Sequence, residues 1–121
     1  MHIYSTLSSN AAAGKKQFAV LVDPDKHNEK HFEAIAVMAG EAKVDFLFVG
    51  GSLLTHDRLD SCLKVLSANT GIPKIIFPGS TLQINSKADA ILFLSLISGR
   101  NAEMLIGKHV VAAPYLKNSF W

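Results

Sequence analysis

The sequence has little of three things that would assign it to particular protein classes. It contains a single cysteine, Cys62, so no disulfide can form within the chain, as is typical of a reducing compartment. Its net charge is only +2 and its lysines are scattered, which argues against a nucleic-acid-binding protein. No apolar run approaches the roughly 20 residues of a membrane span, and the N-terminus lacks the pattern of a signal peptide. We therefore expect a cytoplasmic protein without a transmembrane segment.

Common cofactor and metal motifs are also missing. There is no Gly-x-Gly-x-x-Gly, no Walker loop and no Cys-x-x-Cys. Among the five histidines only His27 and His31 are suitably spaced, and they sit at a predicted helix start, so we interpret them as solvent-facing. Cys62 is expected to be a buried or half-buried helical thiol. The chemistry must therefore come from other residues.

What is present indicates one folded domain of alternating strands and helices. Of the 121 residues 49% are hydrophobic and 18% are charged, which suits a folded chain with a modest core. The expected strands cover residues 17–23, 44–51, 72–79 and 88–98. The expected helices cover residues 28–42, 56–71 and 101–113, with Pro114 as the stop of the last and a short helix within the first fifteen residues. Such alternation predicts an α/β fold with a parallel sheet and right-handed crossovers.

Polar residues follow each strand, and the carboxyl ends of parallel strands meet at one side of a sheet. The first strand ends in Asp23-Pro24-Asp25-Lys26. Because Pro24 disfavours helical geometry in the residue before it, we expect Asp23 to be extended at the rim of the sheet. There it could be a ligand for Mg²⁺, which takes one or two carboxylates together with phosphate oxygens, or a capping or turn aspartate. Asp25 fits a helix cap, and Lys26 is either solvated or meets a phosphate.

The later strand ends carry weaker signals of the same kind. Gly50 and Gly51 would let the backbone approach an anion, and Ser52 would either cap a helix or offer its hydroxyl to a metal. Gly79 and Ser80 follow the third strand. Near the end of the fourth strand, Arg100 could bind an anion through two hydrogen bonds, the alternative being a surface arginine.

Taken together, three strings in the sequence closely resemble the geranylgeranylglyceryl phosphate synthase family, the PcrB-like prenyltransferases. The strings are FAVLVDPDK, DFLFVGGSLLT and IPKIIFPGSTLQINSKADAILFLSLISGRNAEMLIGKHVVAAP, and the resemblance covers roughly residues 15–119. It implies a TIM barrel that transfers a polyprenyl group, with Mg²⁺, from its diphosphate to the C3 hydroxyl of sn-glycerol 1-phosphate in ether phospholipid biosynthesis. Asp23 matches the metal aspartate of the family and Ser52 its second metal-binding position. The candidate contacts to the diphosphate or the prenyl chain are Lys26, Gly50, Gly51, Gly79, Ser80 and Arg100.

The length of the chain limits what this resemblance implies. A complete (β/α)₈ barrel needs at least about 200 residues, so we expect the N-terminal half of a TIM barrel, a single partial domain over residues 1–121. In the family, the residues that bind glycerol phosphate belong to the other half of the barrel. The chain by itself is therefore expected to be inactive. One alternative is a non-catalytic half-barrel that binds phosphate or diphosphate or pairs with another chain. Another is a different phosphate-handling barrel enzyme. Open sheet edges would favour self-association.

Overall fold

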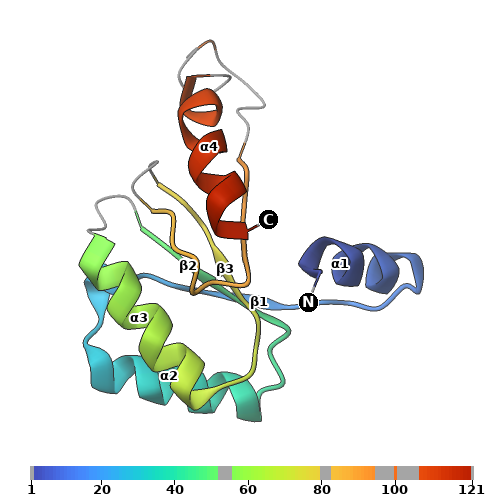
Figure 1. The fold of residues 1–121 in the computed structure, drawn as a ribbon. Helices are drawn as coiled ribbons and strands as arrows, with labels where there is room; N and C mark the ends of the chain where they lie inside the picture. The colour runs from blue at the N-terminus through green and yellow to red at the C-terminus, as the bar shows by residue number, and fades with distance from the viewer. Residues whose placement is uncertain (1, 52–55, 80–82, 95–99, 101–106, 121) are drawn as a thin grey trace.

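In the part of the chain that the structure describes, four parallel strands form one sheet whose spatial order follows the sequence, β1-β2-β3-β4 (Figure 1). The computed structural model describes residues 2–51, 56–79, 83–94, 100 and 107–120. The strands are β1 (Ala19–Val22), β2 (Phe46–Val49), β3 (Lys74–Ile76) and β4 (Ala90–Ile91). The helices are α1 (Ile3–Ala12), α2 (Glu29–Glu41), α3 (His56–Asn69) and α4 (Lys108–Phe120), with a short 3₁₀ turn η1 (Pro24–Lys26). The predicted parallel α/β alternation and the short N-terminal helix are confirmed.

Helices α2 and α3 lie side by side and cover one face of the sheet (Figure 1). Both helices have the predicted apolar spacing, which turns one stripe of each toward the strands. The buried residues of these stripes include Phe32, Ala36, Ala39, Leu59, Leu63 and Leu66. Fully burying a leucine or phenylalanine side chain contributes about 1.5–3 kcal/mol. This helix layer is therefore the main core of the described part of the chain.

Strand side chains alternate between the two faces of the sheet. Those that face the helix layer and are buried there are Val22, Leu47, Val49 and Ile76. On the opposite face Phe46 and Ile75 form a smaller cluster with Ile3 of α1. The alternation thus divides the apolar residues into a large cluster and a small one.

The opposite face is covered less completely than the sequence predicts. The apolar run through β1 predicts a strand buried on both faces, and this is wrong for the second face. Leu21 is 56% exposed, and Phe18, just before the strand, is 64% exposed. Helix α1 reaches only part of this face, through Ile3 and the partly buried Leu7. The apolar run of β1 therefore places some of its residues on a face of the sheet that the described residues leave exposed.

The fourth strand is much shorter than predicted. The sequence predicts a strand over residues 88–98, whereas β4 covers only Ala90–Ile91. It pairs with β3 through Ile75–Ala90 and Ile76–Ile91. Phe93 and Leu94, which follow, are exposed, and residues 95–98 lie outside the described part of the chain.

The last helix differs from the prediction in its position, and Pro114 does not end it. The sequence predicts a helix over residues 101–113 that stops at Pro114, but α4 spans Lys108–Phe120 and contains Pro114; residues 101–106 lie outside the described part. Proline removes one helical hydrogen bond. Ala112 and Leu116, on either side of it, are both buried, so the packing of this stripe offsets that loss. Among the described ranges, no helix has both the length and the apolar character needed to cross a bilayer.

Cys62 lies in α3 within the main core, as the sequence predicts, and its burial gives a testable result. The side chain is fully buried, and burial raises the pKa of its thiol from 9.0 to about 12. Such a shift lowers the thiolate fraction at neutral pH by about 1,000-fold. We expect the native chain to react with a disulfide reagent far more slowly than the chain in concentrated guanidinium chloride. Rapid modification of the native chain, with circular dichroism showing it still folded, would contradict this burial.

Candidate functional site

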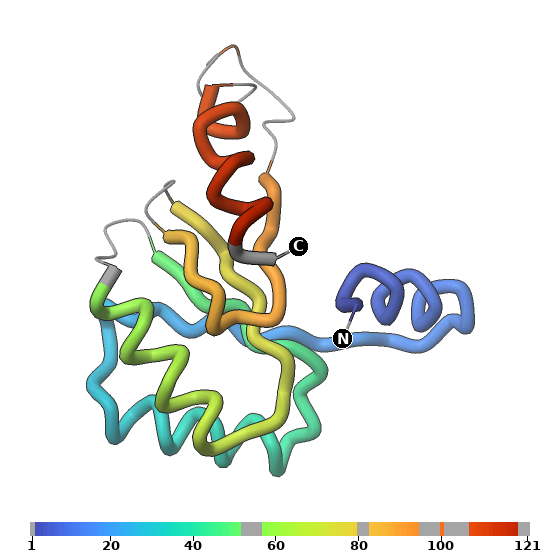
Figure 2. Tube along the Cα trace, viewed as in Figure 1, coloured from blue at the N-terminus to red at the C-terminus, as the bar shows by residue number. Residues whose placement is uncertain are grey.

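The carboxyl ends of β1, β2 and β3 lie at the same side of the sheet, as their parallel pairing requires (Figure 2). Asp23 follows β1, Gly50 and Gly51 follow β2, and Gly79 lies a few residues beyond β3. Four of the residues predicted to form a site are therefore gathered at this edge.

Asp23 has the extended backbone that Pro24 predicts, with φ −97° and ψ 109°. Its side chain is half-buried and caps η1, because Oδ1 accepts a hydrogen bond of 3.0 Å from the backbone N–H of Asp25. The capping alternative is thus confirmed. Capping occupies one position on one carboxylate oxygen, and a carboxylate has further lone pairs, so the metal role is compatible with it and stays a prediction.

The predicted cap at Asp25 is wrong. Helix α2 is capped by Asn28, whose Oδ1 accepts from the N–H of His31 at 3.1 Å. Asp25 instead pairs with Arg58 of α3, with 3.3 Å between Oδ1 and Nε. The carboxylate of Asp25 therefore joins the loop after β1 to the neighbouring helix.

Arg58 fixes the loop after β1, although it is not among the site residues predicted from the sequence. Its Nη2 donates to the carbonyl oxygen of Pro24 at 2.6 Å and to that of His27 at 3.0 Å, and Nε donates to Pro24 at 3.2 Å. Three hydrogen bonds and one ion pair thus tie α3 to the segment that carries Asp23. No local pattern signals this role, because the partners lie about thirty positions earlier in the chain.

Gly50 and Gly51 allow a close approach of neighbouring groups. A Cβ on Gly50 would lie 1.9 Å from the carbonyl oxygen of Phe77, far inside van der Waals contact. A Cβ on Gly51 would lie 2.6 Å from Oδ1 of Asp23. Only glycine fits at either position without displacing a neighbour. The two glycines therefore let the backbone after β2 pass between β3 and the carboxylate after β1.

Gln83 joins the loops after β2 and β3 and is likewise not among the predicted site residues. The side chain is 1% exposed; its Oε1 accepts from the N–H of Gly79 at 3.0 Å, and its Nε2 donates to the carbonyl oxygen of Gly51 at 2.5 Å. A polar residue between the predicted strands over residues 72–79 and 88–98 gives no reason to expect burial. Since the N–H of Gly79 is already bonded to Gln83, a role for Gly79 in binding an anion stays a prediction.

The remaining predicted residues are less closely placed. Lys26 lies in η1 and is exposed, and Arg100 is exposed between two segments outside the described part. Ser52 and Ser80 themselves lie outside the described residues. The structure thus brings together Asp23, Gly50, Gly51 and Gly79 and does not test the other four residues.

The residues at this edge offer a metal ion few protein ligands. Nowhere in the described ranges do three or more His, Cys, Asp or Glu side chains gather as a potential metal site. A magnesium ion bound to a substrate diphosphate needs only one or two carboxylates from the protein. Asp23, half-buried beside the glycine backbone, fits that requirement. The described residues of this edge do not form a closed metal site made of protein ligands alone.

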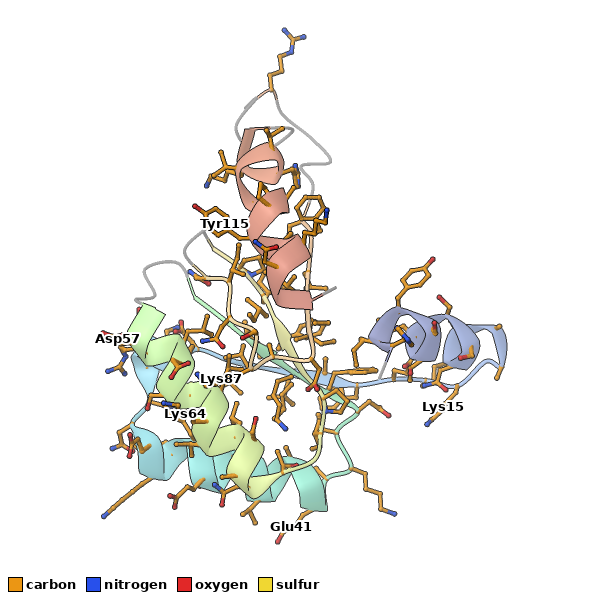
Figure 3. All side chains as sticks on the ribbon, viewed as in Figure 1. Lys15, Glu41, Asp57, Lys64, Lys87 and Tyr115 are labelled. Atoms are coloured by element: carbon orange, nitrogen blue, oxygen red, sulfur yellow. The ribbon has the colours of Figure 1, made fainter. Side chains whose placement is uncertain are left out.

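A separate polar hollow lies between α2 and α3, with a volume of about 500 Å³. It is lined by Glu29, Asp57, Asp60, Ser61 and Lys64. Hydrogen bonds from Lys87, Asn85 and Lys64 hold the pKa of the Asp60 carboxyl well below its usual range. Figure 3 shows Lys64 and Lys87 beside α3 and Asp57 near its first turn. None of the predicted site residues lines this hollow.

Comparison with known sequences places this geometry in a family context. The sequence model of the PcrB family matches residues 12–119. A geranylgeranylglyceryl phosphate synthase of Chitinophaga pinensis is 47% identical over 117 residues, which are 97% of this chain and 46% of that protein. The synthase of Spirosoma linguale is 50% identical over 107 residues, 88% of this chain and 43% of that protein. The chain thus spans less than half the length of the curated relatives it matches.

Solved structures give the same picture of the fold. The crystal structure of (S)-3-O-geranylgeranylglyceryl phosphate synthase from Thermoplasma acidophilum, in complex with its substrate sn-glycerol-1-phosphate, matches with a TM-score of 0.80 and 38% identity. The match covers 85% of this chain and 42% of that enzyme. The wild-type enzyme of Thermoplasma volcanium gives a TM-score of 0.80 at 33% identity. Since these enzymes are TIM barrels, the four-stranded fold is a half-barrel, as predicted.

The close approach of Phe77 to Gly50 predicts that one methyl group added at Gly50 strongly destabilises the fold. Gly50→Ala should lower the free energy of unfolding by about 1–3 kcal/mol or more, because the backbone of β3 must move to admit the Cβ. Gly71→Ala is the matched control, since its Cβ meets nothing within 4 Å, and it should change stability by less than about 0.5 kcal/mol. Urea unfolding measures both. Equal midpoints for the two variants would show that the strand ends are not in close contact.

Proposed function

The chain belongs to the PcrB family, whose matched relatives are geranylgeranylglyceryl phosphate synthases, and from this premise we propose that it carries the donor half of such a prenyltransferase site. In this proposal the site binds a polyprenyl diphosphate together with Mg²⁺. The observation that supports it most directly is the half-buried carboxylate of Asp23, set against the glycine backbone after β2. A carboxylate beside glycine backbone at strand ends suits a metal–diphosphate complex.

Prenyl transfer requires that negative charge be neutralised on the departing diphosphate as the bond to C1 of the prenyl group breaks. Bound Mg²⁺ supplies that neutralisation without a proton transfer. Asp23 and Ser52 would hold the metal. Lys26 and Arg100 would pair with phosphate oxygens, and cations paired with phosphate make the stronger class of hydrogen bonds. The amide of Gly51 and the loop of Gly79 and Ser80 would approach the phosphates. The N–H of Gly50 already donates to the carbonyl oxygen of Val22 at 3.1 Å, so Gly50 would contribute only the space left by its missing side chain.

A prenyl chain also needs an apolar surface next to the diphosphate. Phe77 follows β3 directly, and Phe93 and Leu94 follow β4; all three are exposed. Tyr115 of α4, labelled in Figure 3, is exposed as well. We propose that this apolar surface beside the strand ends lines part of the prenyl groove.

The acceptor is the second element of the proposal. The Thermoplasma acidophilum enzyme binds sn-glycerol-1-phosphate as a substrate, and this chain matches 42% of that enzyme. We propose that sn-glycerol 1-phosphate is also the acceptor here, with its binding groups outside residues 1–121. Those residues alone would then bind the donor without transferring it, because an oriented nucleophile can supply several kcal/mol of the barrier lowering.

The half-length match also favours a second candidate, a half-barrel that binds diphosphate or another chain without catalysis. The two candidates share the binding of diphosphate and differ in turnover. Labelled sn-glycerol 1-phosphate, geranylgeranyl diphosphate and Mg²⁺ should give no prenylated product with residues 1–121. Product formation by this chain would overturn the expected inactivity and would identify it as an enzyme in its own right.

Asp23→Asn separates metal binding from capping. Asparagine caps helices as well as aspartate does, so the free energy of unfolding should change little. Removing the charge should weaken Mg²⁺-dependent binding of geranylgeranyl diphosphate by about 10-fold or more, since one tenfold step corresponds to about 1.4 kcal/mol. Isothermal titration calorimetry measures this effect. The control is Asp57→Asn, which removes one exposed charge from the first turn of α3, and equal affinities for both variants would refute the role of Asp23.

Self-association is expected from the uncovered face of the sheet. Strands β1 and β4 are the two edges of the described sheet, and Leu21 of β1 is largely exposed. Sedimentation velocity should show concentration-dependent oligomers of residues 1–121. Leu21→Lys should shift them toward the monomer, whereas Val37→Lys, at an exposed position of α2, should not. A wild-type chain that stays monomeric at all concentrations would contradict this expectation.

A further inference from the structure

We propose that Gln83 is a positioning residue for Asp23, acting through the backbone of Gly51; this inference rests on the proposed donor site. Gln83 lies outside every strand and helix, yet its side chain is almost completely buried. Both ends of its amide are bonded to backbone, Oε1 to the N–H of Gly79 and Nε2 to the carbonyl oxygen of Gly51. One side chain thus joins the loops that leave two neighbouring strands.

The polarity of the two partners fixes the orientation of this amide. The N–H of Gly79 can only donate and the carbonyl of Gly51 can only accept, so a flipped amide would face two like groups. The side chain is therefore locked, and so is the direction of the Gly51 carbonyl. Leaving either buried backbone group without a partner would cost about 1–3 kcal/mol.

The backbone of Gly51 in turn limits where the carboxylate of Asp23 can lie. A Cβ on Gly51 would come within 2.6–3.0 Å of all three atoms of that carboxylate group, so the carboxylate occupies the space beside Gly51 that a side chain would need. The N–H of Asp25 donates to Oδ1 of the same carboxylate, and Arg58 donates to the carbonyl oxygen of Pro24. Arg58 therefore fixes the loop that bears Asp23, and Gln83 fixes the backbone of Gly51 beside the carboxylate.

Magnesium is the cation for which such positioning matters most, because it demands near-ideal octahedral geometry. A carboxylate free to rotate would offer that geometry only part of the time. Residues that orient metal ligands commonly affect metal affinity by about 10–100-fold. Gln83 contacts no reacting atom in this scheme, and its effect on the ligand site passes entirely through Gly51.

Two variants separate positioning from general stability. Gln83→Met keeps the length of the side chain and removes both hydrogen bonds. The matched control is Asn85→Leu, two residues later, where another buried amide bonds to Asp60 of α3 and not to the strand ends. Both variants should lower the melting temperature. Only Gln83→Met should weaken Mg²⁺-dependent binding of inorganic diphosphate, by about 10-fold or more. Equal affinity loss in both variants, or none in Gln83→Met, would overturn the proposal.

A second measurement needs no ligand and so does not depend on the proposed function. The amide of Asp25 reports on the Asp23 carboxylate because it donates to Oδ1. In ¹H–¹⁵N spectra of the folded chain, Gln83→Met should shift this amide and speed its hydrogen exchange, while Asn85→Leu should leave it unchanged. If the wild-type chain binds no diphosphate, the proposed donor site fails. An unperturbed Asp25 amide in Gln83→Met would instead refute the link from Gln83 to Asp23.

Discussion

The close approach of three strand ends is the constraint on which the rest of this structure depends. The carbonyl oxygen of Phe77 occupies the space where Gly50 would carry a Cβ, and the carboxylate of Asp23 occupies the space where Gly51 would carry one. Backbone can come this near to backbone and carboxylate only where side chains are absent. The parallel register of β1, β2 and β3 brings the three ends to one level. Because Gly50 and Gly51 have no Cβ, no side-chain atom keeps these three strand ends apart.

Two long side chains from elsewhere in the chain hold these ends in place. Arg58 reaches from α3 to the carbonyl groups of Pro24 and His27, and Gln83 reaches from an irregular segment to Gly51 and Gly79. Both bind backbone groups that no strand ladder satisfies, and buried backbone groups need partners. The same contacts that complete the hydrogen bonding of the loops therefore also set the geometry of the candidate site. Stability and positioning are coupled here through the loop backbone.

The sequence predicted most of the sheet and helix layer because the hydrophobic period is local information. The stripe of Leu59, Leu63 and Leu66 and the apolar runs of β1 and β2 are read directly from neighbouring residues. The predictions were wrong where contacts with residues distant in the sequence determine the local structure. Pro114 stays helical because the residues beside it are packed, and Asp25 is not a cap because Arg58, far along the chain, pairs with it. Likewise Asp23 and the two glycines were found from the residues at strand ends, whereas Gln83 acts through partners that no pattern reveals.

The strand order has a consequence for how the chain can acquire its structure. Each strand pairs with the one just before it, so every ladder joins residues separated by no more than about 30 positions, a range in which loop closure is entropically inexpensive. A sheet built in this way can grow one unit at a time as the polypeptide leaves the ribosome. The helix layer can then close before any later segment is made. The opposite face of the sheet gains no such cover from α2 and α3, and Leu21 stays exposed on it.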